Sequence, residues 1–262
     1  MRRLPLLVLV SLSLHTPAWS QTPDAGVAPA SPANDAPSFA AKFDQLWLIR
    51  DQGDVMKQMH ALTSAALVAS PQDFAVLVRA ARLKNWEADG QNNGKIKQNY
   101  GQDAWALADR ALHVKPDSAD AQYQKAIGIG YYSQAIGVLT ALSQGIEKKF
   151  LTPLDFAVNH DPGLEHGGPL LAKGRYWFEL PWPKRDLEKS KQVLGECIAK
   201  YPENLRCYVF LAETELKDGD AKKAKATIQK AIQGVSDYDP PESRRAKQFA
   251  KDLAVRIEEE LQ

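Results

Sequence analysis

The sequence predicts an all-α fold: a solenoid of about five helical hairpins with a capping helix at its C-terminal end. Apolar residues recur at helical spacing along most of the chain from Ser38 onward, and no convincing segment alternates between apolar and polar residues. Five prolines, each following a helical stripe, recur 38 to 46 residues apart. Regular recurrence of this kind indicates repeated helical units that stack side by side.

Composition excludes several classes of protein. The chain has 262 residues, with 33 Lys and Arg against 32 Asp and Glu, and 44% of it is hydrophobic. So balanced a charge argues against a broad nucleic-acid-binding surface, and so large an apolar fraction argues against a disordered chain. Two cysteines are too few for a disulfide framework or a four-cysteine metal site.

Residues 1–20 have the pattern of a secretory signal peptide. Arg2 and Arg3 precede an apolar run from Leu4 to Leu14, and small residues precede a predicted cut after Ser20. The run is shorter than the roughly 20 residues that a membrane-spanning helix needs, and no later segment is apolar enough to cross a membrane. No cysteine near the cut could accept a lipid. We therefore expect export, to the periplasm in a Gram-negative cell, with a retained N-terminal anchor as the alternative.

Residues 21–37 are rich in Pro and Ala and contain no aromatic residue. Such a segment buries too little apolar area to offset the entropy that is lost when a chain is ordered. We interpret it as a disordered linker between the signal peptide and a helical-repeat domain over residues 38–262.

The helical segments follow from the apolar stripes. Phe39, Phe43 and Trp47 share one helix face, and a stripe from Tyr132 to Phe150 predicts a single long helix. The predicted helices cover 39–51, 53–69, 72–88, 102–114, 119–149, 152–160, 168–179, 186–200, 204–218, 220–234 and 241–261.

Prolines and small residues indicate how these helices pair. The prolines that follow helical stripes are Pro71, Pro116, Pro162, Pro202 and Pro240. A proline cannot continue the helix before it, but it can open the next segment. A small residue, in most cases Ala, lies near the helix end that precedes each of these prolines, where two helices would touch closely. This unit of helix, turn and helix is typical of a tetratricopeptide-like (TPR-like) array.

Further residues mark the expected helix ends. The sequence predicts tight turns between paired helices at Gly53, Gly101 and Gly219. It also predicts Thr152 as an N-cap before Pro153, and Asp186 as the N-cap of the next long helix.

Cys197 and Cys207 lie at equal distances on either side of Pro202. In an antiparallel hairpin, equal offsets from the turn bring two residues side by side, and an oxidising compartment favours a bond between them. We predict a Cys197–Cys207 disulfide that acts as a structural staple. Two buried free thiols are the alternative.

No standard catalytic or nucleotide-binding motif occurs in a fitting context. His160, Asp161, Glu165 and His166 have the chemistry of metal ligands, but their spacing matches no standard ligand motif, and a structural turn is the favoured interpretation. We therefore predict no catalytic residue, no cofactor and no metal. A metalloprotein or enzyme centred on this segment is the least favoured hypothesis.

The densest aromatic cluster follows this segment and contains Tyr176, Trp177, Phe178 and Trp182. Aromatic residues at helical spacing usually belong to a core. However, prolines on both sides of Trp182 exclude it from a helix, and a Trp on a rigid loop is suited to anchor an interface.

The same segment carries a resemblance to a known family. Its residues are, in order, His166-Gly167-Gly168-Pro169, Gly174-Arg175-Tyr176, Pro181-Trp182-Pro183, and Asp186 with Lys189. In this order they resemble the T-component family of TRAP (tripartite ATP-independent periplasmic) transporters, which are periplasmic TPR-like proteins. The resemblance extends from about Phe39 to about Gly234 and is specific over 160–220.

The resemblance implies a non-enzymatic helical scaffold that associates with a periplasmic solute-binding component and assembles as a trimer. It also implies a hydrophobic or organic-acid ligand that passes between the two components. The candidate residues for partner or ligand binding are His166, Arg175, Trp177 and Trp182. The alternative function is that of a generic periplasmic TPR adaptor in envelope assembly.

Overall fold

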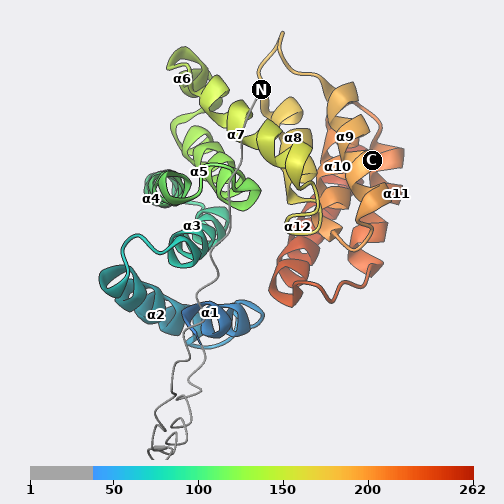
Figure 1. Ribbon diagram of the computed structural model, residues 1–262. Helices are drawn as coiled ribbons and strands as arrows, with labels where there is room; N and C mark the ends of the chain where they lie inside the picture. The colour runs from blue at the N-terminus through green and yellow to red at the C-terminus, as the bar shows by residue number, and fades with distance from the viewer. Residues whose placement is uncertain (1–37) are drawn as a thin grey trace, which may run out of the picture. The chain divides into compact units, whose positions relative to one another are not determined.

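Helices make up all the regular secondary structure of residues 38–262, which are the residues described by the computed structural model. The expected signal peptide and linker lie outside them. The helices are α1 Phe39–Trp47, α2 Val55–Ala69, α3 Phe74–Asp89, α4 Gly94–Val114, α5 Ala119–Ile136, α6 Val138–Ser143, α7 Ile146–His160, α8 Gly168–Glu179, α9 Leu187–Lys200, α10 Leu205–Lys217, α11 Ala221–Gln233 and α12 Pro240–Glu260 (Figure 1). The prediction of an all-α fold is confirmed.

These helices pair into five hairpins and a terminal helix, as the sequence predicts. The pairs are α1 with α2, α3 with α4, α5 with α7, α8 with α9, and α10 with α11, while α12 packs on α10 and α11. Successive hairpins follow a curved path from α1 over α7 to α11 (Figure 1). The first four predicted prolines lie in the turns between hairpins, and Pro240 opens α12.

Each part of the array has its own apolar core. Phe43, Met59 and Leu83 are buried together in the first hairpins, and Ile228 and Ile257 are buried at the other end. A chain of local cores of this kind is what stacked repeats produce, because each repeat buries its apolar face against its neighbours.

The start of α4 differs from the sequence prediction. The helix begins at Gly94, where the Asn93 side chain accepts hydrogen bonds from two backbone N–H groups, so Gly101 lies inside a helix and not at a turn. A Cβ atom on Gly101 would lie 2.8 Å from the carbonyl oxygen of Gly128 in α5. No residue of α4 before Gly101 is buried, so no apolar stripe marks the start of this helix.

The predicted helix over 119–149 is also wrong, because it is broken twice. Gly137, with φ 89°, separates α5 from α6, and Gly145, with φ 68°, separates α6 from α7. In the short α6, Ala141 is buried and Val138 and Leu142 are partly buried, so apolar residues recur at helical spacing across both breaks. Helix α7 then starts at Ile146, and Pro153 lies buried within it; Thr152 is therefore not an N-cap.

Other local predictions agree with the structure. Gly53 and Gly219 lie in turns with positive φ, and the Asp186 side chain caps α9 by accepting the Lys189 N–H at 2.9 Å. Cys197 of α9 and Cys207 of α10 are buried with their Cα atoms 6.3 Å apart and their sulfur atoms at disulfide distance. Among residues 38–262, no helix combines the length and the apolar character needed to cross a membrane.

Candidate functional site

The curved array surrounds a central cavity of about 530 Å³, hereafter the hollow. This volume falls within the range of small-molecule pockets. One part of its wall is apolar and is formed by Phe150, Leu171, Phe210 and Phe249, from α7, α8, α10 and α12. The remaining wall is crowded with ion pairs.

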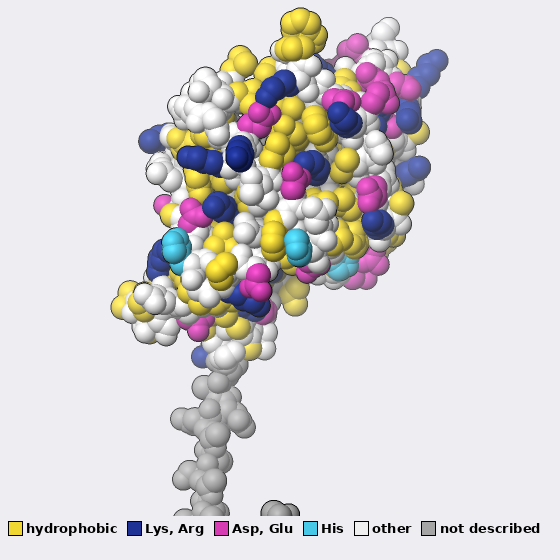
Figure 2. Space-filling model, turned by 45° about the horizontal axis from the view of Figure 1, so that its top comes forward, with side chains coloured by type: hydrophobic (Ala, Val, Ile, Leu, Met, Phe, Trp, Pro, Cys, Tyr) yellow, Lys and Arg dark blue, Asp and Glu magenta, His cyan; other side chains and the backbone are white. Residues whose placement is uncertain are grey.

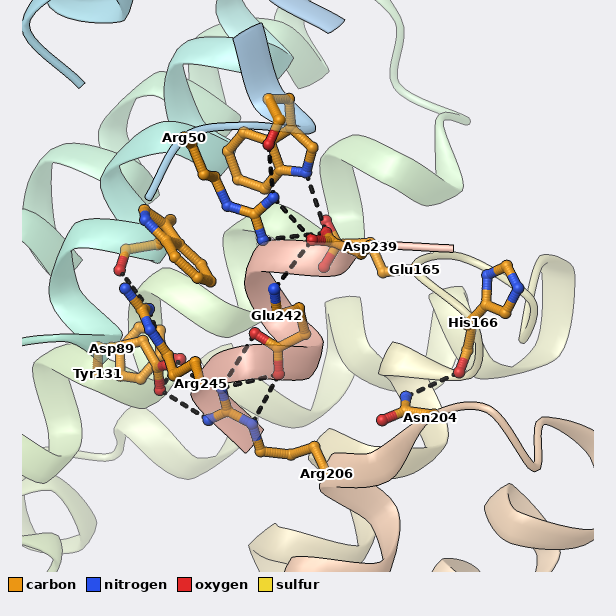
Figure 3. Close-up of polar contacts among 12 residues, drawn as sticks. Arg50, Asp89, Tyr131, Glu165, His166, Asn204, Arg206, Asp239, Glu242 and Arg245 are labelled. Atoms are coloured by element: carbon orange, nitrogen blue, oxygen red, sulfur yellow. Dashed lines mark hydrogen bonds and ion pairs between the residues drawn. The ribbon is translucent and has the colours of Figure 1, made fainter. Parts of the chain in front are cut away.

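Asp89, the last residue of α3, is the centre of this polar wall (Figure 3). Its carboxylate accepts hydrogen bonds from the Tyr131 hydroxyl at 2.9 Å, from Arg206 at 3.1 and 3.2 Å, and from Arg245 at 3.1 Å. Burial alone would raise the pKa of Asp89, but the two guanidinium groups and the hydroxyl outweigh it and hold that pKa at about 2. Asp89 is therefore ionised and tightly held at neutral pH.

Arg206 of α10 joins Asp89 to Glu242 of α12 (Figure 3). It is 6% exposed, and its guanidinium donates to the two carboxylate oxygens of Glu242 at 2.8 and 3.0 Å. Burial nevertheless raises the pKa of Glu242, and the nearby charge of Asp89 adds to this effect, while Arg206 acts against it. Two neighbouring carboxylates thus have pKa values that are displaced in opposite directions.

A second buried pair joins the two ends of the array. Arg50, just after α1, is 1% exposed and lies 2.8 Å from Asp239, the N-cap residue of α12. The indole N–H of Trp47 donates to the same carboxylate at 3.2 Å. Asp239 also accepts the backbone N–H of Glu242 at 3.0 Å, so one side chain both starts α12 and binds the first hairpin.

The guanidinium groups here also stack on indole rings. We use the name Arg–Trp cluster for Trp47, Arg50, Arg82, Trp86 and Arg245. Arg50 lies 3.9 and 3.8 Å from the ring centroids of Trp47 and Trp86, Arg82 lies 4.1 Å from that of Trp47, and Arg245 lies 3.1 Å from that of Trp86. Cation–π contacts gain strength where water is excluded, so this cluster reinforces the ion pairs.

The turn that precedes α8 explains the Gly-Gly-Pro motif. Glu165, His166 and Gly167 all have positive φ values, of 47°, 52° and 87°. A side chain on Gly167 would collide with the ring of Tyr201, and one on Gly168 with the hydroxyl of Tyr123, so only glycine fits at either position.

This left-handed turn is fixed from both sides. Glu165 forms an ion pair with Arg82 at 2.8 Å and accepts a hydrogen bond from Gln124 at 3.1 Å. On the other side, the Asn204 side chain donates to the backbone oxygen of His166 at 2.8 Å (Figure 3).

The four predicted site residues do not converge. Arg175 lines the hollow, where it pairs with Glu213 and lies 4.6 Å from the ring centroid of Phe210. The exposed His166 stacks on Tyr238 with ring centroids 3.8 Å apart. Neither Trp177 nor Trp182 belongs to the lining of the hollow.

Trp177 and Trp182 occupy different surroundings. Trp177 is partly buried, and the ammonium group of Lys189 in α9 lies 4.6 Å from its ring centroid. Trp182 is 87% exposed in the segment between α8 and α9.

The candidate metal ligands are also engaged separately. The ring of His160 stacks on Phe156, that of His166 on Tyr238, and the carboxylate of Glu165 faces Arg82. Within residues 38–262, no group of three or more His, Cys, Asp or Glu side chains is arranged to hold a metal ion.

The residues of the polar wall were not found from the sequence. Asp89, Arg206 and Glu242 are charged residues of ordinary surface type, and they come together only through the curvature of the array. Arg206 did carry a weak signal, since it stands between two apolar residues, Leu205 and Cys207, that are both buried.

The fold was compared with known structures. A thermophilic TPR protein from Thermus thermophilus, known from a crystal structure, is similar to this chain with a TM-score of 0.59. The fold is TPR-like. The similarity covers 82% of this chain and 97% of the other, at 18% sequence identity, and at this identity it shows the fold alone. No protein-family model and no curated protein matches the sequence.

Proposed function

We propose that this chain is an exported, non-enzymatic scaffold that binds a protein partner and serves as the T-component associated with a TRAP transporter. The TPR-like fold supports a scaffold, because stacked helical hairpins provide extended surfaces for binding. The signature residues of the resemblance support the transport role, and a disulfide is compatible with export. The proposed partner is a periplasmic solute-binding component, and the proposed assembly is a trimer.

The observation that carries the proposal is the exposure of Trp182 on a braced loop. The Arg185 side chain donates to the backbone oxygen of Leu180 at 2.9 Å, and Lys184 pairs with Glu147 of α7 at 2.6 Å. The loop backbone that carries Trp182 is therefore held in place. A loop that is already ordered loses little backbone entropy when its Trp binds a partner.

Further apolar surface lies next to the loop. A small cleft of about 60 Å³ runs between α6, α7 and the end of α8, and Val138, Phe150 and Leu180 are among the residues that line it. Leu139, beside the cleft, is 70% exposed. On the face drawn in Figure 2, acidic, basic and hydrophobic side chains are interspersed, so we expect the partner to bind by apolar contact rather than by a field of one charge.

A pull-down from periplasmic extract tests the proposal. We expect Trp182→Ala to lose the solute-binding component that the wild-type protein recovers. Val68→Ala is the matched control, because Val68 is 84% exposed on α2. Recovery of the same proteins by Trp182→Ala and by the wild type would remove the loop from the interface.

A periplasmic TPR adaptor in envelope assembly is the second candidate. The TPR-like fold is compatible with this role as well, because stacked helical hairpins provide extended surfaces for binding a protein partner. Neighbouring genes for TRAP membrane and solute-binding components would support the transport role, and neighbouring genes for cell-wall synthesis would support the adaptor.

A further inference from the structure

The two ends of the array touch across the hollow. Arg50 and Asp239 are 189 residues apart in the sequence, Asp51 and Arg244 are 193 apart, and Asp89 and Arg245 are 156 apart. Each pair joins the first hairpins to the beginning of α12. These pairs close the array into a ring-like arrangement. The packing of each hairpin on its neighbours would not by itself require this contact.

This closing contact differs in kind from the packing of neighbouring hairpins. Helix α12 packs closely along α10 and α11, where Ala250, Leu253 and Ile257 are buried in an apolar core. Its contact with the first hairpins is instead made by the ends of long charged side chains and by two indole rings. Separation of this contact exposes mainly groups that water solvates well, whereas separation of α12 from α11 would expose a core.

The most distorted backbone of the described chain lies beside this contact. Glu165 and His166 are its two non-glycine residues with positive φ, and they lie in the turn that connects α7 to α8. That turn joins the first three hairpins to the last two. Left-handed conformations are unfavourable for such residues and persist where surrounding contacts impose them, here Arg82 on Glu165 and Asn204 on His166.

We propose that the contact between α12 and the first hairpins is a latch, and that the protein alternates between this closed form and an open form. In the closed form, Asp239 and Arg245 hold α12 against the first two hairpins. In the open form, these pairs separate, the 161–167 turn relaxes, and the hollow becomes a groove that admits a ligand too large for the closed form. The latch is independent of the proposed partner contact at Trp182.

Distances between spin labels test the latch. Val68→Cys on α2 and Val255→Cys on α12 place one label on each side of it, because both positions are exposed and the native cysteines are paired. Asp239→Asn removes the charge but keeps a good N-cap residue, and Arg245→Gln removes the opposite charge. We expect each to increase the population of long label-to-label distances relative to wild type.

A matched control removes an ion pair that does not cross the hollow. Lys225 in α11 pairs with Glu258 in α12 at 2.8 Å, so Lys225→Gln should leave the distance distribution unchanged. One unchanged distribution in wild type, Asp239→Asn and Arg245→Gln, with circular dichroism showing all three folded, would overturn the proposal.

Hydrogen exchange of the wild-type protein decides the matter if the variants fail to fold. A latch that opens predicts weaker protection of the amides at 243–246 than of those at 250–257, although both segments lie inside α12. Equal protection along this length of α12 would contradict a separate opening step.

Discussion

The polar wall of the hollow shows how two carboxylates can differ although they share one arginine. Asp89 receives hydrogen bonds from Arg206, Arg245 and Tyr131, whereas Glu242 has Arg206 as its side-chain partner. Desolvation opposes charge at both positions. At Asp89 the additional donors outweigh desolvation and lower the pKa. At Glu242 desolvation is the larger effect and raises the pKa.

These two residues should therefore respond differently to loss of charge. We expect Asp89→Asn to lower the free energy of unfolding by about 3 kcal/mol or more at neutral pH, because it leaves the buried guanidinium of Arg206 and the partly buried one of Arg245 without their shared partner. Glu242→Gln should cost much less, since the charged form of Glu242 is already disfavoured. Urea unfolding of both variants measures the difference, and equal losses would show that the two carboxylates are equivalent.

The pH dependence of stability should also depend on Asp89. Its pKa of about 2 lies below the usual value of 3.8, so ionised Asp89 stabilises the fold above pH 4, and this stability is lost as the pH falls towards 2. The shift corresponds to about 2 kcal/mol. Glu242 acts in the opposite sense: its pKa is raised, so its contribution is present below its ordinary value and is lost as the pH rises.

Thermal melting between pH 6 and pH 2 checks this expectation. The difference in Tm between wild type and Asp89→Asn should shrink as the pH falls below 4. A difference that stays constant over this range would mean that Asp89 has an ordinary pKa in the folded protein.

Among the helices, the α4–α5 crossing depends on the absence of side chains. A Cβ atom on Gly128 would lie 2.7 Å from the backbone nitrogen of Trp105 and 2.9 Å from the carbonyl oxygen of Gly101. Both neighbouring atoms are backbone and cannot move aside cheaply. Gly128 is thus fixed by a contact between helices rather than by its own conformation.

Gly128→Ala should therefore lower stability by about 1–3 kcal/mol, the usual cost of overpacking. Gly195 in α9 provides the matched control, because a Cβ atom there meets nothing within 4 Å. Gly195→Ala should raise stability by about 0.5–1 kcal/mol, since Ala favours the helix. Thermal melts of the two variants should move in opposite directions, and a shift of the same sign in both would contradict this account of the crossing.

The same helices show what the sequence could reveal. Segments with large apolar side chains among their buried residues, such as α2 and α3, were predicted within about two residues of their observed bounds. The first turns of α4 were missed because none of the residues before Gly101 is buried, so no apolar stripe marks them. The two breaks around α6 depend on single glycines with positive φ, which no change in apolar spacing marks.

For the whole molecule, closure of the array is the property that the sequence could not predict. The contact between the end of α1 and the start of α12 depends on the rotations between all five successive hairpins added together. No local sequence pattern predicts that total rotation. The resemblance made Arg175 a candidate for partner or ligand binding, and the structure shows that it lines the hollow. Arg50, Asp89 and Asp239 carry no local signature of their meeting.

The closed form should also change how the molecule unfolds. An open array of repeats unfolds in parts, because each repeat contacts only its neighbours. Here the latch couples the ends, so wild-type unfolding in urea should be a single transition, while Asp239→Asn should separate it into two. Of the five tryptophans in residues 38–262, Trp47, Trp86 and Trp105 lie in the first half, and Trp182 in the second half is already 87% exposed. Fluorescence therefore gives more weight to the first half, while circular dichroism reports on all the helices.

The measurement compares the urea unfolding curve followed by fluorescence with the curve followed by circular dichroism. Coincident curves for the wild type and separated curves for Asp239→Asn are the expected result. Coincident curves for both would show that the apolar packing between neighbours is sufficient for cooperativity.

The contact between Arg50 and Asp239 has a consequence for the evolution of this chain. TPR-like proteins can gain or lose internal units, because each addition merely lengthens the stack. In this molecule, duplication or deletion of one unit would separate Asp239 from Arg50 and leave both charged side chains without their ion-pair partner. We therefore expect homologues that conserve this pair to conserve the number of units between them, and homologues of different length to have lost it.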